Sequence, residues 1–449
     1  MADEPGGNWI LAESRNLRLF TLFILYVAQG VPIGLFWFAI PAWMASNGAS
    51  AADVGYVLGL TALPWTLKLV NGFIMDRYTF LPMGRRRVWI IGAQMVMIAL
   101  MAGAAVIRPQ VGDVLLLAAI GFLVNMATTF QDVAVDGLAV DIMEEDERAR
   151  GSGMMFGGQA IGAAMATSLT GMAMASLGPA AAYLLSAGFV ALITLYVIAL
   201  RERKGERRTP WSPGQTHERN RLVHVGAWWP IMSHTFRSIL APISLIWLPT
   251  LISRGIHYGA LSGATPLIGA QELGWSEEQV TALVGMAQLA AGVAGLTIGG
   301  WIGDRLGAKN ATIGVYASYI ALNLAMILGS SMWGDVHVFR AFVFAWLILD
   351  TLLTVVALPI SMRLCDPRVA ATQFCLYMAM SNLGITLGAW TLGLSEMLGG
   401  LPVVFGIVVG WHVLGMLILI FVRFPERGTD VSEVAAQLAE GEGPEPVRN

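Results

Sequence analysis

The sequence predicts an all-α membrane protein with twelve transmembrane helices, arranged as two six-helix halves related by pseudo-two-fold symmetry. Three observations support this prediction. Hydrophobic residues make up 56% of the 449-residue chain and charged residues only 13%, about half the charge that is typical of a soluble domain. Apolar stretches of about 20 residues, the length that crosses a bilayer, recur along the chain. Sequence patterns of the first half return in the second half.

The apolar stretches set the span boundaries and the domain organisation. We expect spans near residues 18–45, 54–75, 88–107, 113–141, 152–175, 180–200, 241–271, 279–302, 310–331, 337–362, 371–396 and 401–422. A polar break rich in Arg, Pro and Ser follows the sixth span. The predicted domains are a cytoplasmic N-terminus (1–17), an N-terminal six-helix bundle (18–200), a cytoplasmic linker (201–240), a C-terminal six-helix bundle (241–422) and a cytoplasmic tail (423–449). We expect the tail to be disordered, because it is polar, acidic and rich in Gly and Pro.

Charge sets the predicted orientation. With both termini on one side, that side collects all of the 27 Lys and Arg residues except Arg108 and Arg340 on the other face and Lys68 and Arg254 inside spans. The positive-inside rule therefore predicts a multi-pass protein of the cell inner membrane with both termini cytoplasmic. The polar, acidic start of the chain is unlike a cleavable signal peptide, so we expect the first span to be retained. A net charge of −3 without a basic face gives no indication of a nucleic-acid partner.

Three sequence patterns repeat between the halves at nearly constant offsets. Gly-x-x-x-Asp-Arg follows the second span as Gly72 to Arg77 and the eighth span as Gly300 to Arg305. The fourth span leaves through DERARGSGMMFG and the tenth through DPRVAATQFCLY. AQGVPIGLFWFAIPAW in the first span aligns with SRGIHYGALSGATPLI in the seventh, so that two glycines and a proline coincide. Such internal repeats are typical of transporters that are built from two related halves.

The repeated Gly-x-x-x-Asp-Arg, followed by Gly and basic residues, resembles the signature loop of the major facilitator superfamily. The first copy is stretched, since Tyr78 to Met83 separate Arg77 from Gly84, and the second copy ends in Gly-Ala-Lys. The resemblance covers all twelve spans. It implies the major facilitator fold, with alternating access to a cavity between the two halves.

LPWTLKLVNGFIMDR, FQDVAVDG and GGQAIG resemble a narrower branch, which includes bacterial muropeptide permeases and acetyl-coenzyme A transporters. Some siderophore permeases resemble the same branch. It shows a Lys in span 2, a Gln-Asp-x-x-x-Asp in span 4 and a Gly-Gln in span 5, which here are Lys68, Gln131, Asp132, Asp136, Gly158 and Gln159. The resemblance implies an amphipathic, partly anionic solute that is muropeptide- or peptide-like, with a siderophore or an acyl-coenzyme A as alternatives.

Three aspartates in and beside the fourth span need an explanation, because an ionised carboxylate in hydrocarbon costs on the order of 3 kcal/mol. Asp132 and Asp136 lie one turn apart on one helix face. Like charges so close disfavour simultaneous ionisation. We therefore predict proton coupling at this pair, with Asp136 as the group that titrates and with sodium as the alternative coupling ion. Asp141 and the acidic run Glu144 to Glu147 are expected to be a solvated helix end.

Lys68 is the predicted partner of Asp132. Counted inwards from Asp76 and from Asp141, Lys68 and Asp132 lie at similar depth, about 12 Å inside their spans. Spans 2 and 4 are neighbours in the implied fold, so we predict an ion pair that keeps Asp132 ionised and offsets the desolvation cost. Two readings stay open. The pair is either a purely structural bridge or part of a substrate or proton route, which ionisable residues in spans usually mark.

The seventh span carries a second predicted cluster. The repeat alignment places Arg254 opposite Gln29, near mid-membrane, with His257 and Tyr258 one turn further on. Arg254 presents a rigid fork of donors that suits a carboxylate or phosphate, and His257 and Tyr258 can hydrogen-bond. We expect these residues to bind substrate. The alternatives for Arg254 are a salt bridge to Asp350, the charge deep in span 10, or a position outside the membrane.

The two Gly-Asp-Arg loops are predicted to form a conformational latch on the cytoplasmic side. The latch residues are Asp76, Arg77, Arg85, Asp304 and Arg305. An aspartate at a helix end can accept hydrogen bonds from a neighbouring helix N-terminus and hold the halves together. The alternative is that the basic residues are only solvated positive-inside charge.

Other residues in the spans have two readings. Gln29, Gln131 and Gln159 are predicted to bind substrate, although Gln159 could instead face a helix interface. Four tryptophans could stack on a ligand or serve packing and interfacial anchoring, namely Trp37, Trp65, Trp247 and Trp346. Small residues four apart predict close helix packing, at Gly153, Gly157, Gly158 and Gly162 in span 5 and at Gly292, Gly295, Gly299 and Gly300 in span 8.

No enzyme activity, cofactor or metal site is predicted. Gly-x-Ser-x-Gly, His-Glu-x-x-His and phosphate-loop motifs are absent from the sequence. His224, His234 and His412 stand alone, without metal-ligand spacing, and Cys365 and Cys375 read as ordinary small core residues.

The sequence therefore predicts a monomeric secondary active transporter that takes up a small-molecule solute by proton-coupled symport. One rival is a non-transporting receptor, scaffold or assembly factor, against which the set of intramembrane charges argues. Another is an exporter of lipophilic drugs, which would prefer fewer cations. The direction of transport stays open.

Overall fold

The computed structural model describes residues 9–422 apart from residues 145–146, 223–232, 234–239, 241 and 366–369. The predictions for residues 1–8 and for the tail lie outside the described residues, and so do His224, His234 and the side chains of Asp76 and Asp304. The described chain is nearly all helical, and its extended segments meet in one isolated bridge between Ile10 and Arg201.

The N-terminal half consists of long helices joined by short connections. A first helix runs through α1 (Arg15–Ile33), η2 (Gly34–Ala39) and α2 (Ile40–Ser46), and is followed by α3 (Ala51–Arg77), α4 (Arg87–Ile107), α5 (Val114–Ile142), α6 (Arg148–Leu177) and α7 (Pro179–Ala199). The segment η2 is a π-helical stretch, which shifts the register of the chain between α1 and α2. The short helix α8 (Glu218–Leu222) lies in the linker.

The C-terminal half repeats this arrangement with α10 (Pro242–Leu273), α11 (Glu277–Ala294), η5 (Gly295–Gly299), α12 (Gly300–Leu328), α13 (Val336–Arg363), α14 (Ala370–Leu398) and α15 (Pro402–Phe421). The boundary between expected spans 8 and 9 differs from the prediction. Gly307 has φ 73° and ψ 151°, which breaks α12 in two. Only a residue without a Cβ adopts this conformation readily, so residues 300–306 continue the preceding helix and the next one starts at Ala308.

The all-helical membrane fold class is confirmed, because eight helices in the described part of the chain are long and apolar enough to cross a membrane. They lie within Arg15–Ser46, Arg87–Ile107, Val114–Ile142, Arg150–Leu177, Pro179–Ala199, Arg305–Leu328, Val336–Arg363 and Pro402–Phe421. The long helices α3, α10, α11 and α14 occupy the positions of expected spans 2, 7, 8 and 11, and their crossing of the bilayer remains a prediction.

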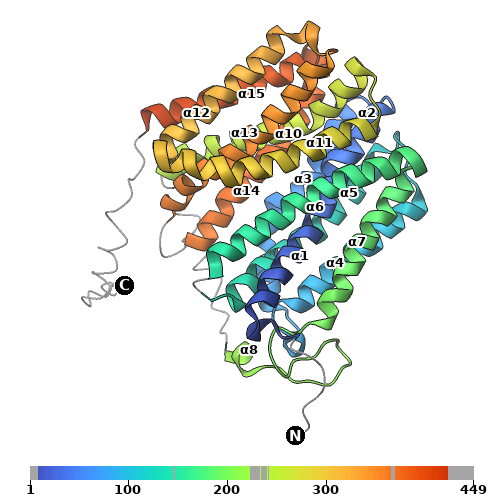
Figure 1. Ribbon diagram of the computed structural model, residues 1–449, viewed down its shortest axis with the longest axis vertical. Coiled ribbons are helices and arrows are strands. Elements are labelled where there is room, and N and C mark those ends of the chain that lie inside the picture. The colour runs from blue at the N-terminus through green and yellow to red at the C-terminus, as the bar shows by residue number, and fades with distance from the viewer. Residues whose placement is uncertain are drawn as a thin grey trace.

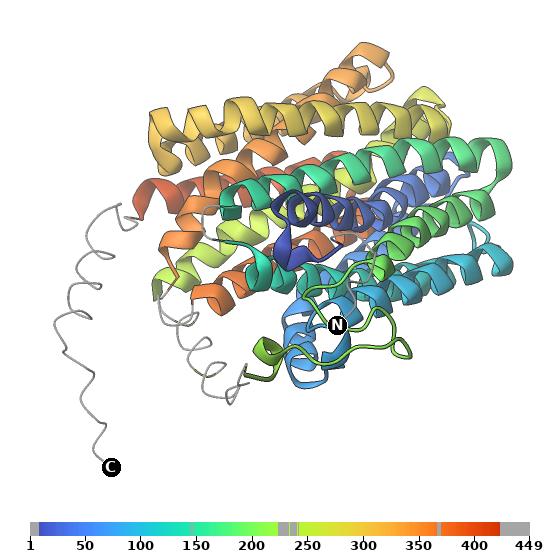
Figure 2. The ribbon, with the colours of Figure 1, turned by 60° about the horizontal axis from the view of Figure 1, so that its bottom comes forward.

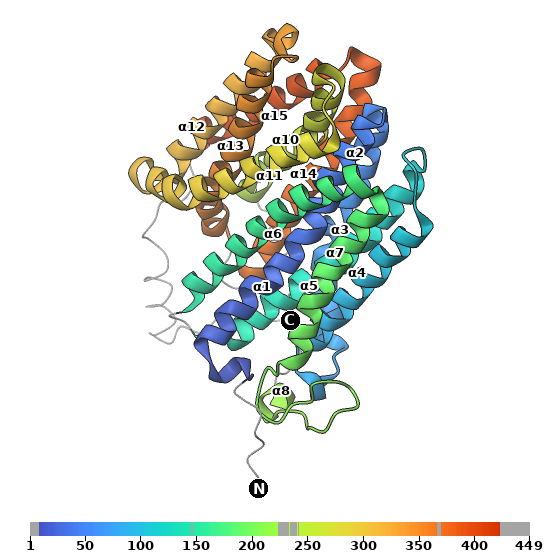
Figure 3. The same cartoon turned by 45° about the vertical axis from the view of Figure 1, so that its right-hand side comes forward.

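The two halves meet along two helix pairs. Figure 1 shows the N-terminal half in blue to green and the C-terminal half in yellow to red, with α3 beside α14 and α6 beside α11 at the join. The same pairs lie side by side in the view of Figure 3. Seen from another direction, α6 and α11 run along each other in the upper part of Figure 2. The halves therefore contact each other through spans at equivalent positions of the repeat.

We call the side that carries loop 78–86 and linker residues 200–217 the basic side, and the side that carries loops 47–50, 274–276 and 399–401 the opposite side. Two helices that begin on the opposite side, α3 and α11, have side-chain caps. Ser50 accepts a hydrogen bond from the backbone of Asp53 at α3, and Ser276 and Gln279 form a capping box at α11. Such caps satisfy backbone groups that the helix cannot pair itself.

Glycines bring helices into close contact within each half. A Cβ at Gly30 on α1 or Gly34 on η2 would meet the backbone of α6 at residues 159–167, and a Cβ at Gly255 or Gly259 on α10 would meet the backbone of α14 at residues 381–389. The repeat alignment therefore corresponds to one packing motif used twice. In span 5 the predicted close packing is present at Gly158 and Gly162, whereas a Cβ added at Gly153 or Gly157 would have nothing within 4 Å.

Candidate functional site

Lys68 and Asp132 form an ion pair between α3 and α5. The Lys68 Nζ lies 3.2 Å from Asp132 Oδ2, and the side chains are 17% and 5% exposed. Gln29 on α1 donates a hydrogen bond of 2.7 Å to the other carboxylate oxygen of Asp132. Both oxygens of this buried carboxylate are therefore satisfied, by one cation and one neutral donor from different helices. A buried charge is tolerated when it is paired and hydrogen-bonded in this way.

Asp136 has a partner that the sequence did not suggest. The Tyr26 hydroxyl on α1 donates a hydrogen bond to Asp136 Oδ1. Tyr26 and Gln29 lie one turn apart on α1, as Asp136 and Asp132 do on α5, so the second contact follows the first by one helical turn. The exposed ring of Phe156 packs edge-on against Tyr26. If Gln29 had been assigned to Asp132, the one-turn spacing of the two aspartates on α5 would have indicated Tyr26, one turn from Gln29 on α1, as the partner of Asp136.

The charges of the C-terminal half form a looser pair. Arg254 Nη2 on α10 lies 3.7 Å from Asp350 Oδ2 on α13, a separation too long for a hydrogen bond. Its Nη1 donates to Ser381 Oγ on α14 at 3.3 Å. Asp350 Oδ1 and Arg254 Nε are buried without a hydrogen-bond partner among the described residues. The salt bridge to Asp350, one of the alternatives for Arg254, is thus present. It leaves Arg254 Nε and Asp350 Oδ1 without a hydrogen bond from the described residues.

The two pairs correspond under the repeat. Gln29 and Arg254 occupy matching positions of the aligned first and seventh spans, and each contacts an aspartate on the fourth span of its own half. In the N-terminal half the aspartate is paired with a cation from a third helix, Lys68 on α3. In the C-terminal half the cation is Arg254, the residue that matches Gln29. The repeated scaffold therefore places one cation beside one carboxylate in each half, and the N-terminal half has Asp136 as a second carboxylate one turn away.

His257 and Tyr258 point in different directions from α10. His257 is fully buried inside the C-terminal bundle, its ring centroid 3.8 Å from that of Tyr319 and 5.1 Å from that of His412. His412, which has no histidine near it in the sequence, thus lies beside His257, because α15 packs against α10. Tyr258 instead packs against Trp37 and Trp346, with centroids at 5.7 Å and 6.0 Å.

The tryptophans that the sequence singled out are packed side chains. Trp37 contacts Trp65 edge-on at 6.1 Å, and the Trp65 indole donates to Asn125 at 2.9 Å. Trp247 is fully buried and donates to Ser361 at 3.0 Å. Packing and hydrogen bonding thus account for Trp65 and Trp247, and the Trp37–Tyr258 contact joins the two halves.

The remaining glutamines have different surroundings. Gln131 is buried and donates to the carbonyl of Leu25 at 2.9 Å, which ties α5 to α1. Gln159 is half-buried on α6, where its backbone carbonyl lies against Gly30. A role of either side chain in binding substrate stays a prediction.

The residues of the predicted latch are only partly described. Arg77 is exposed, and the Arg305 guanidinium lies 4.7 Å from the centre of the Trp301 ring. Arg85 contributes its backbone N–H, which together with those of Arg86 and Arg87 donates to the Glu202 carboxylate at 2.5–2.8 Å. The carboxylate that accepts hydrogen bonds from the N-terminus of α4 therefore belongs to Glu202 of the linker.

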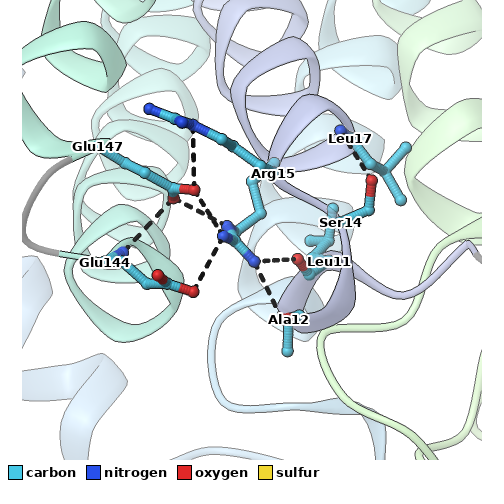
Figure 4. A network of polar contacts seen from close by, with 8 residues as sticks. Leu11, Ala12, Ser14, Arg15, Leu17, Glu144 and Glu147 are labelled. Carbon is cyan, nitrogen blue, oxygen red and sulfur yellow. Dashed lines mark hydrogen bonds and ion pairs between the residues drawn. The ribbon is translucent and has the colours of Figure 1, made fainter.

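The expected solvated acidic end of span 4 is wrong in detail. Asp141 accepts a hydrogen bond of 3.2 Å from Arg86 Nε. Glu147 is buried and receives two hydrogen bonds from the buried Arg18, at 2.7 and 3.0 Å, in the network of Figure 4. These hydrogen bonds hold the pKa of the Glu147 carboxyl below its ordinary value. The charges fasten the start of α1 to the start of α6, on the basic side.

Long apolar helices that carry buried ion pairs define a multi-pass membrane protein. A family model described as "Major Facilitator Superfamily" matches residues 22–389. The chain therefore belongs to the major facilitator superfamily, a family of transporters rather than enzymes. The resemblance noted in the signature loops is confirmed.

Curated relatives point to one branch of this family. An anhydromuropeptide permease of Escherichia coli (strain K12) is 26% identical over 156 residues, a match that covers 33% of this chain and 31% of the permease. The match thus spans only about a third of that relative's length. A Rickettsia conorii protein described as a transporter and named AmpG 4 is 22% identical over 315 residues, which cover 65% of this chain and 69% of that protein.

Solved structures agree on the fold. A crystal structure of the nucleoside transporter NupG has a TM-score of 0.68 and 12% sequence identity to this chain, and the superposition covers 90% of this chain and 99% of that one. At this identity the likeness shows the fold alone.

Proposed function

We propose that this protein is a proton-coupled importer of an amphipathic, partly anionic solute, with an anhydromuropeptide as the first candidate. The observation that supports it best is the polar cluster of α1, α3 and α5, in which Lys68, Gln29 and Tyr26 surround Asp132 and Asp136. Ionisable side chains inside membrane helices usually serve a substrate or ion route. The curated relatives that include anhydromuropeptide permeases supply the substrate class.

In this proposal the two aspartates have different tasks. Asp132 stays ionised, because Lys68 and Gln29 occupy both of its oxygens. Among the described residues Asp136 receives one hydrogen bond, from the neutral Tyr26 hydroxyl, and Asp136 takes up and releases the proton. Protonation removes the negative charge next to Asp132, which changes the balance of charge inside the N-terminal half by one unit in each cycle.

Arg254 is the proposed anchor for an anionic group of the solute. Its guanidinium is 25% exposed and holds Asp350 at 3.7 Å without a hydrogen bond. A solute carboxylate could form the bidentate contact that Asp350 does not make, at little cost to the existing pair. The orientation with both termini in the cytoplasm, the inner-membrane location and the monomeric state are parts of the same proposal.

The test is uptake of a labelled anhydromuropeptide into proteoliposomes, with and without an inward proton gradient. We expect uptake to need the gradient and to be lost in Asp136→Asn. The exposed Asp113, in the loop between α4 and α5, offers a matched control. Its carboxylate accepts a hydrogen bond from the backbone N–H of Gln110, and the Asp113→Asn variant should transport normally. Gradient-independent uptake in Asp136→Asn at the wild-type rate would remove the coupling role, and absence of any uptake by folded protein would remove the muropeptide.

A further inference from the structure

A glutamate of the C-terminal half caps a helix of the N-terminal half on the opposite side. Glu396, near the end of α14, accepts a hydrogen bond of 2.9 Å from the backbone N–H of Ala52, in the first turn of α3. The first N–H groups of a helix have no partner within the helix, and they lie at the positive end of its dipole. The carboxylate is exposed and keeps its hydration on the outer side.

A second glutamate of the C-terminal half accepts a hydrogen bond from the N-terminal half, between α11 and α2. Glu277, at the start of α11, accepts a hydrogen bond of 2.8 Å from the Ser46 hydroxyl at the end of α2. The residues are half-buried, and Ser46 belongs to the N-terminal half whereas Glu277 belongs to the C-terminal half. The two contacts therefore join the halves through different helices on the same side of the molecule.

Below these contacts the halves are tightly packed. A Cβ at Gly55 on α3 would come within 2.9 Å of the Leu392 Cβ and closer still to the Ala389 carbonyl, both on α14. Leu58, Ala389 and Leu392 are each 0% exposed. We call this buried contact of α3 and α14, at Gly55, Leu58, Ala389 and Leu392, the seam. The two carboxylate contacts lie on the outer side of the seam, and any motion that opens the opposite side must break them.

We propose that Glu277 and Glu396 form a latch that keeps the opposite side closed and thereby sets the balance between the two conformations of the transport cycle. This inference concerns the gate and holds whichever solute is carried. The Glu396 carboxylate at the N-terminus of α3 and the hydrogen bond from Ser46 to Glu277 are each weak interactions, which suits a latch that must open in every cycle. The sequence predicts a latch of related chemistry only on the basic side, at the Gly-Asp-Arg loops.

The latch can be tested through a buried thiol in the seam. Leu392→Cys, in a background in which Cys365 and Cys375 are replaced by Ser, reacts with a maleimide only when the opposite side opens. Labelling in detergent makes the result independent of membrane orientation. We expect Glu277→Gln and Glu396→Gln each to raise the labelling rate about twofold to tenfold, the range that corresponds to the usual stabilisation by such contacts, and the double variant to raise it by the product.

The chain offers matched controls. Glu278, next to Glu277 on α11, is exposed, and Glu278→Gln should leave the labelling rate unchanged. Ala118→Cys places a thiol in the buried core of α5, where the rate should stay low in all variants. Faster labelling there would mean general loosening of the fold and would overturn the latch.

A double-mutant cycle separates the latch from unrelated effects of charge. Ser46→Ala removes the donor to Glu277, so its effect on labelling should add little to that of Glu277→Gln. Effects that multiply fully, or labelling rates of both glutamine variants equal to that of Glu278→Gln, would refute the proposal.

Discussion

The Lys68–Asp132 pair allows a quantitative test of the charge balance inside the N-terminal half. Lys68→Met removes the cation and leaves the Asp132 carboxylate, 5% exposed, with Gln29 as its remaining partner. At 3.2 Å and an effective dielectric constant of 20, the lost attraction is about 5 kcal/mol. Removing one partner of a buried pair costs about 3–5 kcal/mol for the same reason. We therefore expect a clear fall in the melting temperature of the detergent-solubilised protein.

The double variant Lys68→Met/Asp132→Leu decides whether charge is the cause. It removes both charges and keeps apolar volume at both positions, so most of the lost stability should return. Solute uptake should stay absent if the pair belongs to the transport route, and it should return with stability if the pair is only a structural bridge. A double variant as unstable as Lys68→Met would refute the electrostatic account, because no uncompensated charge would then remain to explain the loss.

Three further predictions follow from single contacts. Tyr26→Phe removes the hydroxyl that donates to Asp136, and we expect the pH profile of uptake to shift while the protein stays folded. Gly55→Val places side-chain atoms against the backbone of α14, so the opposite side cannot close fully and labelling of a seam thiol should rise at least fivefold, since overpacking costs about 1–3 kcal/mol. Burial raises the pKa of Glu206 in the linker to about 7. Because the folded state then binds more protons than the unfolded state, stability falls as the pH rises from about 4.5 to 7, and Glu206→Gln should flatten this dependence in thermal melts.

Each of these predictions has a control and an outcome that contradicts it. Phe156→Leu changes the neighbour of Tyr26 without touching the hydrogen bond, and an equal shift in that variant would exclude the hydroxyl as the cause. Gly103 on α4 has nothing within 4 Å of an added Cβ, so Gly103→Val should leave the seam thiol protected. A pH dependence in Glu206→Gln identical to that of the parent would show that another group is responsible.

Much of the fold and one contact of the site could be predicted from the sequence. The apolar stretches, the repeated Gly-x-x-x-Asp-Arg and the aligned glycines give the halves and the order of the helices, because span length and helix packing depend on local patterns. The Lys68–Asp132 contact could be predicted because depth in a helix is a count of residues at 1.5 Å each. A break between expected spans 8 and 9 was predicted within residues 303–309, and the structure has it at Gly307. Its tightness was not predicted, since glycine occurs in many helices that do not break.

The sequence by itself determined the class of the protein, its two related halves and the presence of charges that the bilayer would not tolerate unpaired. Only the tertiary structure decided which side chains meet across helices. The contacts Tyr26–Asp136, His257–His412, Arg18–Glu147 and Glu396–Ala52 join residues far apart in the chain. Such contacts depend on the rotation and the sliding of one helix against another. Close glycine contacts between backbones help to fix both, and a one-dimensional pattern does not contain either.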